Sequence, residues 1–335
     1  MKLFTPLLLC TVVFISAGCG GRAVKNNTAG EPADMVAAHR EPEKKFSRAD
    51  IVMEKDFLYD QHTLADTFPY KDTVRIFQFD KMRECLFLLD SIQLEPSRWA
   101  VLQNRQNKNG EAPLVKKWER NEYKNVSDMY GVQRYQSVPL YLPGDSVPER
   151  YGRDGALVKL IRENADSTVY RLEAYDVAGH WESPAKYVRL LSDTTVFRKA
   201  VMVDRTNQNI ATVEKVGDKW LIRSMNPATT GVHNPPYAHE TPEGMFVVQE
   251  KKPKMLYTHD GSSSLAGFAP WASRFSNGGY LHGVPTNDPN GAIIEYSWTL
   301  GTTPRSHMCV RNASSHAKFI YDWGPTEGTI VFVYD

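Results

Sequence analysis

A short stretch near the C-terminus places a thiol between two groups that can carry positive charge. Cys309 lies two residues after His307 and two residues before Arg311. A free cysteine has a pKa of about 8.5, and the thiolate is its nucleophilic form. Neighbouring positive charge lowers that pKa and so increases the thiolate fraction. The stretch therefore predicts a reactive cysteine and nucleophilic catalysis.

The residues after the cysteine predict a short helix. The segment 313–324 is amphipathic at helical spacing, with serines near its start and Gly324 at its end. We therefore expect Cys309 to lie just before a helix start. The positive end of the helix dipole would then stabilise the thiolate further.

Two motifs together resemble the signature of the L,D-transpeptidases, the YkuD-type cysteine enzymes of bacterial cell walls. The first is His282-Gly283, and the second is Ser306-His307-Met308-Cys309-Val310-Arg311. The resemblance extends over residues 195–335, through Thr230-Gly231, Thr241-Pro242-Glu243-Gly244 and a final strand at 329–334. It implies a mainly β catalytic domain, sandwich-like or barrel-like, with a short helix after the cysteine.

The resemblance also implies roles for the residues of these motifs. Cys309 would be the nucleophile and His282 its base, with the Gly283 backbone orienting the imidazole. His307 is the rival for the base, because residues two apart in an extended segment share a face. Ser306 would support the loop by hydrogen bonding. Arg311 would either bind a substrate carboxylate or brace the loop.

Met308 departs from the family pattern, which has glycine at this position. If the loop needs a positive backbone φ there, methionine strains the oxyanion hole; if it needs only a peptide N–H, methionine serves equally well. Because the surrounding residues agree with the family, we expect the second case. The N–H groups near His307, Met308 and Cys309 would then hold the oxyanion.

Other residues of this domain are weaker candidates for the site. Arg305, Trp271 and Tyr280 belong to this group, and aromatic packing is the simpler account of the last two. The interval from His282 to Cys309 is longer than is usual in the family, which predicts an enlarged loop over the site.

Composition and spacing exclude several classes of function. The formal net charge of the 335-residue chain is +1, which argues against a nucleic-acid partner. Among the histidines and Cys309 of the C-terminal half, His307-x-Cys309 is the only pair with close ligand spacing, and His-Glu-x-x-His and Cys-x-x-Cys motifs are absent. We therefore expect neither a metal nor a cofactor.

The N-terminus has the form of a lipoprotein export signal. An apolar run from Leu7 to Ile15 is too short to span a bilayer, and small residues precede Cys19. We expect a signal peptide at 1–18, an acylated Cys19 and a flexible tether at 19–45. The protein would then be a membrane-anchored lipoprotein of the cell envelope that faces the periplasm. An ordinary secretory signal or an uncleaved segment is the alternative.

The length predicts two or three domains. Residues 46–128 form a mixed segment without a recognisable role, with a helix expected at 73–92 and a strand at 99–102. Short alternating strands predict a small β-barrel at 129–192. Its end resembles a bacterial Src-homology-three-like domain, in which Trp181 and Tyr187 would pack the barrel or line a peptide groove.

Cys85 raises the question of a disulfide. An exported chain with two remaining cysteines could join Cys85 to Cys309. The helical pattern around Cys85 instead favours a buried, inert thiol.

The resemblance implies a substrate and a reaction. The substrate would be a peptidoglycan tetrapeptide stem, cleaved between diaminopimelate and D-alanine through a thioester, and a second stem would supply the accepting amine. Carbapenem-type inhibitors are expected to acylate the cysteine. Two alternatives remain: an L,D-carboxypeptidase that uses water, and a wall-binding lipoprotein that Met308 has made inactive.

Overall fold

The computed structural model describes residues 46–162 and 168–335, which are mainly β. The predicted signal peptide, Cys19 and tether lie outside the described residues. Within them there are two α-helices, α1 (Phe79–Ile92) and α2 (Ser314–Trp323). Three 3-10 turns lie at Arg48–Asp50, Arg105–Asn107 and Ala185–Tyr187. No described helix has the length and hydrophobicity needed to cross a membrane.

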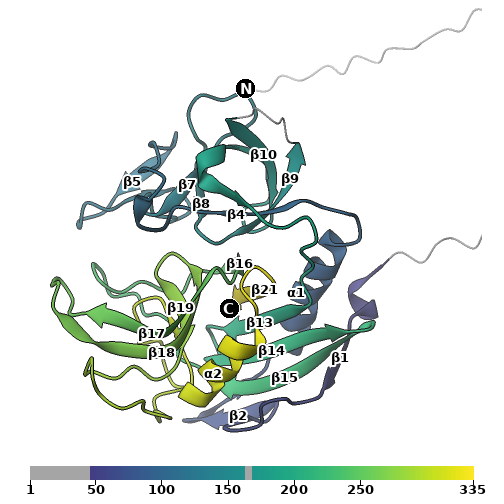
Figure 1. Ribbon diagram of the computed structural model, residues 1–335, viewed down its shortest axis with the longest axis vertical. Coiled ribbons are helices and arrows are strands. Elements are labelled where there is room, and N and C mark those ends of the chain that lie inside the picture. Colours follow the sequence, from purple (N-terminus) through teal and green to yellow (C-terminus); the bar gives the residue numbers. More distant parts are fainter. Residues whose placement is uncertain (1–45, 163–167) are drawn as a thin grey trace, which may run out of the picture. The chain divides into compact units, whose positions relative to one another are not determined.

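A six-stranded sheet forms the centre of the part of the chain that is predicted to be catalytic, called the catalytic part below (Figure 1). In spatial order its strands are β1 (Val52–Lys55), β15 (Lys219–Pro227), β14 (Asn209–Val216), β13 (Lys199–Asp204), β21 (Thr329–Tyr334) and β16 (Gly244–Val247). The C-terminal strand β21 runs parallel to β13 between β13 and β16. The predicted C-terminal strand is therefore an inner strand of this sheet.

Both faces of the six-stranded sheet are covered at β13, β16 and β21, which explains why these strands are almost continuously apolar. Ala200 and Met202 point into one cluster, which α1 completes with Met82, Leu86 and Leu89. Their neighbours Val201 and Val203 point into another cluster on the opposite face, because side chains alternate along a strand. The segment that contains β1 and α1 is therefore part of the core of the catalytic part.

The helix predicted at 73–92 was too long at its start. β2 (Thr67–Tyr70) and β3 (Thr73–Ile76) form a hairpin, and α1 begins only at Phe79. Thr73, Val74 and Ile76 are β-branched, and such residues favour strands over helices. The apolar helical spacing is thus confirmed only from Phe79 onward.

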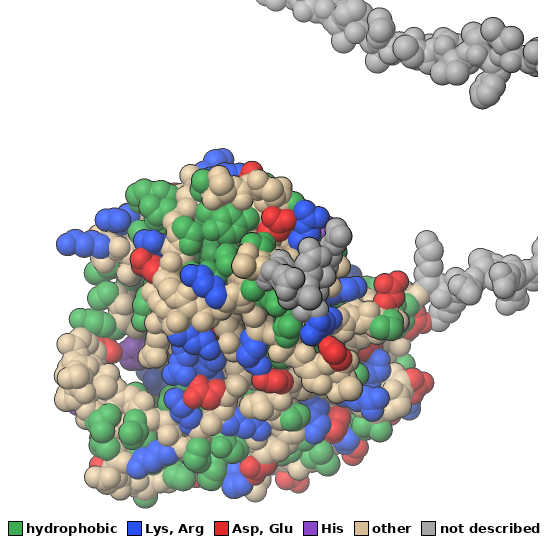
Figure 2. Space-filling model, turned by 45° about the horizontal axis from the view of Figure 1, so that its top comes forward, with side chains coloured by type: hydrophobic (Ala, Val, Ile, Leu, Met, Phe, Trp, Pro, Cys, Tyr) green, Lys and Arg blue, Asp and Glu red, His purple; other side chains and the backbone are tan. Residues whose placement is uncertain are grey.

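A second sheet, with four strands, contains His282 and Arg311, and Cys309 directly precedes its last strand. Its strands are β17 (Glu250–Thr258), β18 (Leu265–Ser276), β19 (Gly279–His282) and β20 (Val310–Arg311). Phe275, Leu281 and Val310 from this sheet share an apolar cluster with Val331 of the first sheet and Ile320 of α2. The predicted sandwich-like fold and the helix after the cysteine are both confirmed. The two signs of charge are interspersed over the face shown in Figure 2.

A third sheet and two hairpins lie within residues 99–190, which are called the small β-domain below. The sheet contains, in spatial order, β11 (Gly179–Pro184), β10 (Val169–Ala174), β9 (Leu157–Arg162), β4 (Trp99–Leu102) and β12 (Val188–Leu190). Two hairpins accompany it: β5 (Trp118–Arg120) with β6 (Val126–Asp128), and β7 (Ser137–Leu140) with β8 (Arg150–Arg153). Strand β4 pairs with β9 and β12, so this sheet includes residues from before position 129.

Two aromatic residues of the small β-domain pack its core. Trp181 and Tyr187 are both buried in one apolar cluster, and Trp181 Nε1 donates a hydrogen bond to the Val177 carbonyl at 2.9 Å. The packing interpretation is therefore correct for both residues. The likeness to a Src-homology-three domain stays a prediction.

The small β-domain and the catalytic part belong to one compact unit, residues 46–335. The Val247 N–H donates to the Gly155 carbonyl at 2.9 Å, and Ala156 forms a β-bridge with Phe246. A Cβ on Gly155 would lie 1.8 Å from the Phe275 carbonyl oxygen, and its φ is +91°. Only glycine fits this contact between the two backbones.

Candidate active site

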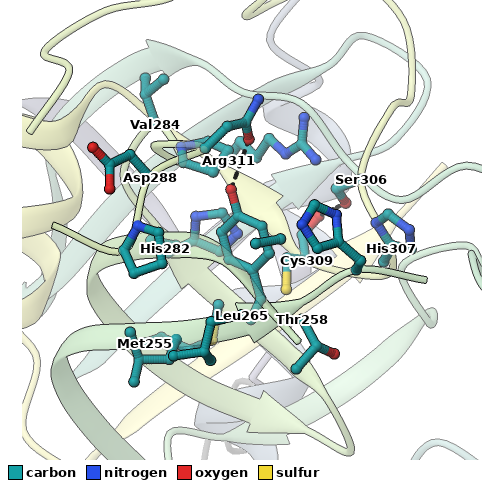
Figure 3. A pocket seen from close by; sticks show the side chains of 18 of the residues that line it. Met255, Thr258, Leu265, His282, Val284, Asp288, Ser306, His307, Cys309 and Arg311 are labelled. Carbon is teal, nitrogen blue, oxygen red and sulfur yellow. Dashed lines mark hydrogen bonds between the residues drawn. The ribbon is translucent and has the colours of Figure 1, made fainter. Parts of the chain in front are cut away.

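The strand pair β19 and β20 brings His282 and Cys309 to one face of the sheet. In the parallel register Leu281 lies opposite Val310, and His282 lies opposite Arg311. Because side chains alternate, His282 and Cys309 project to the side opposite Leu281 and Val310. Both line a cavity of about 1100 Å³ (Figure 3). Other lining residues include Met255, Tyr257, His259, Leu265, Val284 and Leu300.

The His282 imidazole is buried and neutral. Its Nδ1 lies 2.6 Å from the Gly283 carbonyl, which can only accept, so Nδ1 donates and Nε2 is left as an acceptor. Burial lowers the pKa of His282 to about 4, opposed by the Gly283 hydrogen bond and assisted by Arg311. At neutral pH the ring is therefore available as a general base.

Gly283 leaves room for this arrangement because it lacks a Cβ. A Cβ there would lie 2.5 Å from Ser314 Oγ and 2.8 Å from Pro270 Cγ. Ser314 is the first residue of α2, and its hydroxyl accepts the Val284 N–H at 3.1 Å. The hydrogen bond from His282 Nδ1 to the Gly283 carbonyl supports the predicted role of Gly283 in orienting the imidazole.

Cys309 holds a neutral thiol rather than the expected thiolate. Its side chain is buried, and Sγ lies 3.4 Å from the Gly278 carbonyl, to which the thiol donates. Burial raises the pKa of Cys309 to about 11, while a hydrogen bond from the Tyr280 backbone and the Arg311 charge act to lower it. The predicted depression of the thiol pKa is therefore wrong, because desolvation outweighs the nearby positive groups.

Helix α2 lies where the sequence predicts it, but Cys309 is not directly before its start. Strand β20 follows Cys309 directly, and α2 begins only at Ser314. The first turn of the helix contacts Gly283 and Val284. The helix therefore supports the histidine strand.

His307 is engaged with a carboxylate instead of the thiol. Its Nε2 lies 3.1 Å from the Asp260 carboxylate, and its side chain is 51% exposed. The prediction that His307 and Cys309 share a face assumed an extended segment, but Met308 between them has φ +102°. The geometry therefore favours His282 as the base.

Met308 adopts a backbone conformation that favours glycine. A φ of +102° is strained for an L residue with a side chain, at a cost of about 1–3 kcal/mol. The expectation that this position needs only a peptide N–H was wrong. In this chain the position has a positive φ, which methionine adopts under strain.

Hydroxyl groups hold the Met308 loop in place. Thr241 Oγ1 donates to the Met308 carbonyl at 2.8 Å and accepts the Gly231 N–H at 2.8 Å. Ser306 Oγ donates to the Cys309 carbonyl, as predicted for this residue. A Cβ on Gly231 would lie 2.8 Å from Met308 Cα, so the loop packs directly on the Gly231 backbone.

These contacts orient a peptide of the loop. The Met308 carbonyl points towards Thr241, and in a planar trans peptide the N–H points the opposite way. The N–H of Cys309 therefore points away from Thr241. The Thr-Gly and Thr-Pro-x-Gly motifs are explained as supports for this loop.

Arg311 lines the cavity and also braces the loop. Its N–H donates to the Thr229 carbonyl at 2.8 Å, and the Thr229 N–H donates to the Arg311 carbonyl at 3.0 Å. Burial lowers the pKa of its guanidinium, and nearby Cys309 and Tyr257 raise it. The backbone thus braces the loop while the side chain borders the cavity.

The three weaker candidates differ in their surroundings. Trp271 packs edge-on against Tyr321, with ring centroids 5.6 Å apart. Tyr280 is buried beside Cys309, and its hydroxyl lies 3.4 Å from Glu250. Arg305 contributes its backbone N–H to the Thr230 carbonyl at 2.9 Å. Packing therefore accounts for both aromatic side chains.

The structure adds Gly278 and Asp260 to the site. Their contacts with Cys309 and His307 span 31 and 47 residues, so the sequence motifs gave no signal for them. Cys85 and Cys309 are both free, which excludes the disulfide alternative. Burial raises the pKa of Cys85 to about 12. Within residues 46–162 and 168–335, no three His, Cys, Asp or Glu side chains converge as metal ligands do.

Comparison with known proteins agrees with these motifs. The family model for the L,D-transpeptidase catalytic domain, YkuD, matches residues 198–333. The match covers about two fifths of the chain and includes His282, Cys309 and the motifs around them. No curated protein shows significant sequence similarity to the chain.

Similar solved structures include three from different bacteria. One is a fused Zn-dependent amidase/peptidase/peptidoglycan-binding domain-containing protein of Clostridium acetobutylicum, with 20% identity over 41% of this chain and 52% of that one (TM-score 0.30). Another is an L,D-transpeptidase of Stackebrandtia nassauensis, with 24% identity over 43% and 60% (TM-score 0.31). The third is L,D-transpeptidase 3 of Mycobacterium tuberculosis with a faropenem-derived adduct, with 16% identity over 55% and 93% (TM-score 0.33). This chain thus spans about half the length of the first and three fifths of the second.

Proposed function

We propose that this protein is a cysteine-dependent L,D-transpeptidase that cross-links peptidoglycan between diaminopimelate residues. The observation that carries the proposal is the placement of Cys309 and His282 on one face of β19 and β20, in a cavity of about 1100 Å³. The family match over residues 198–333 supports the same class of chemistry.

The first step transfers an acyl group to sulfur. The neutral Cys309 thiol gives its proton to His282 Nε2 as sulfur attacks the carbonyl carbon of an L-centre. Peptide N–H groups of residues 307–309 stabilise the oxyanion, and each such donor is worth about 10²–10³ in rate. The imidazolium then protonates the leaving D-alanine amine, and a thioester remains on Cys309.

The second step releases the thioester to an amine. The side-chain amine of another stem attacks the thioester carbonyl, with His282 accepting the amine proton. The tetrahedral intermediate collapses to an amide, and the proton returns from the imidazolium to sulfur. This route needs a neutral imidazole at the start, which the lowered pKa of His282 provides.

Arg311 and the cavity suit an anionic peptide substrate. The guanidinium borders the cavity, and a substrate carboxylate would offer it a charge-assisted hydrogen bond. Carbapenem-type compounds are expected to acylate Cys309 as well, because their β-lactam carbonyl would meet the same nucleophile.

The proposed setting is the periplasmic side of a membrane. The apolar run followed by Cys19 supports lipid attachment, which would keep the enzyme close to peptidoglycan. Incorporation of labelled palmitate into wild type but not into Cys19→Ala tests this proposal. Equal labelling of the two proteins would refute lipidation at Cys19.

The catalytic proposal is tested with purified protein and tetrapeptide muropeptides, read by mass spectrometry. Wild type is expected to form dimers with loss of D-alanine, and Cys309→Ala is expected to form none. Tripeptides without dimers would instead identify an L,D-carboxypeptidase. Identical products from the two proteins would refute cysteine catalysis.

A further inference from the structure

Asp154 of the small β-domain is buried at the contact with the catalytic part. It lies in the turn between β8 and β9, and its side chain is 1% exposed. One carboxylate oxygen, Oδ1, accepts the N–H groups of Asn104 at 2.8 Å and Arg105 at 3.0 Å. These donors tie Asp154 to the chain segment that follows β4.

The other oxygen of the carboxylate binds the catalytic part. Oδ2 accepts the Arg274 guanidinium at 2.6 Å, the Asn277 N–H at 3.0 Å and Gln249 Nε2 at 3.3 Å. A buried carboxylate is stable only when it is paired and hydrogen-bonded, as this one is. One side chain thus joins the two parts through five donors.

The Asn277-Gly278 turn that Asp154 holds lies against the nucleophile. This turn joins β18 to β19, and the Gly278 carbonyl accepts the Cys309 thiol at 3.4 Å. The next strand supplies the Tyr280 backbone hydrogen bond to the same sulfur. Both backbone groups on the sulfur therefore lie within three residues of Asn277. Asn277 itself has φ +42°, so its anchored N–H fixes an otherwise unfavourable conformation.

A second ion pair connects the same elements. Arg105 lies 2.5 Å from Glu250, and Glu250 also accepts Arg274 Nε at 3.2 Å. The Tyr280 hydroxyl lies 3.4 Å from the same carboxylate. The small β-domain thus holds the elements on either side of the turn that faces sulfur. Asp154 binds Arg274 of β18, and Arg105 binds Glu250 of β17, which also contacts Tyr280 of β19.

From this geometry we infer that Asp154 is a positioning residue for Cys309. It fixes the Asn277-Gly278 turn, and that turn places the backbone groups that orient the thiol and set its reactivity. The small β-domain is therefore a structural part of the reactive centre. The expected effect of Asp154 on acyl transfer rests on the proposed function, whereas its expected effect on the reactivity of the Cys309 thiol does not.

The test compares Asp154→Asn with Asp145→Asn in the full chain. Asp145 belongs to the same small β-domain and pairs with Lys116 at the surface, so it controls for loss of a carboxylate there. Two rates are measured at Cys309 by peptide mass spectrometry: alkylation by iodoacetamide from pH 7 to 9, and acylation by imipenem. Circular dichroism and thermal unfolding report the folded fraction.

Asp154→Asn places an amide N–H group among donors, so the turn is expected to shift away from sulfur. Imipenem acylation should then slow about 10–100-fold, as expected for a misplacement of about 1 Å. The Gly278 carbonyl stabilises the thiol and the Tyr280 N–H stabilises the thiolate, so loss of these contacts should change the alkylation rate about threefold or more. Asp145→Asn should match wild type in both measurements.

A folded Asp154→Asn protein with wild-type rates of both acylation and alkylation would overturn the inference. If Asp154→Asn does not fold, Asp154→Glu decides, since it keeps the charge and displaces the carboxylate by one methylene; it should slow acylation, and wild-type behaviour would refute the inference. If imipenem fails to acylate wild type but Asp154→Asn still changes the alkylation rate, the proposed function fails and the positioning role stands.

Discussion

The strand pair β19 and β20 and the neighbouring loop 305–308 place their residues by different means. His282 on β19 and Cys309 directly before β20 are set by sheet register and by burial. On the loop, Met308 holds a strained φ, and the Thr241 and Ser306 hydroxyls hold its carbonyl and that of Cys309. The strands supply the groups that react, and the loop supplies peptide groups whose direction depends on its supports.

This difference also separates the two histidines. His282 on the strand is buried and neutral, while His307 on the loop is half exposed and paired with Asp260. A base that must accept a thiol proton benefits from the first environment, because burial keeps its acceptor nitrogen unprotonated. The comparison thus assigns the proton transfer to the strand pair.

The largest expected effect comes from removing each histidine in turn. His282→Ala should slow imipenem acylation about 10²–10⁴-fold, the range for loss of a general base. His307→Ala should cost at most about tenfold, because its side chain bonds a surface carboxylate. Intact-mass measurement of adduct formation gives both rates. A larger loss for His307→Ala than for His282→Ala would indicate that His307 is the base.

The second largest expected effect is that of acid on His282. Acylation should fall to half near pH 4, where His282 becomes protonated. The unfolded chain, with a histidine pKa of about 6.5, binds the proton first, so stability from the neutral ring is complete above that pH and is lost as pH falls towards 4. The loss is about 3 kcal/mol. Urea unfolding at pH 7 and 4.5 measures it, with His282→Gln as control; equal pH slopes for the two proteins would contradict the assignment.

The smallest expected effect concerns the loop. Met308→Gly should be more stable than Met308→Ala by about 1 kcal/mol, because glycine adopts φ +102° without strain while alanine does not. The alanine variant controls for loss of the methionine side chain. Urea unfolding midpoints compare the two. A more stable alanine variant would show that the loop backbone is not strained.

Local signals in the sequence predicted the strands and motifs well. The strands expected at 99–102 and 329–334 correspond to β4 and β21, and the helix after the cysteine corresponds to α2. Each has a period or a turn signal within its own residues. The pairing of His282 with the cysteine came from the family motif, and the register of β19 and β20 agrees with it.

Properties that depend on distant parts of the chain were not predictable. The direction of the Cys309 pKa shift follows from burial, which residue spacing near the cysteine does not show. The backbone angle of Met308 depends on packing against Gly231 and Thr241, more than sixty residues away. Asp154 and Arg274 are separated by 120 positions, and neither belongs to a recognisable motif.

The glycine at position 155 has a consequence for building hybrid enzymes. Its missing side chain lets the Phe275 carbonyl approach, and the adjacent Asp154 carboxylate receives the turn beside the thiol. A chimera that keeps this catalytic part but takes its companion module from elsewhere must reproduce both an acidic residue and a glycine at that junction. Without them, the transplanted module would separate the two backbones and leave the Arg274 guanidinium with one of its two carboxylate partners, Glu250.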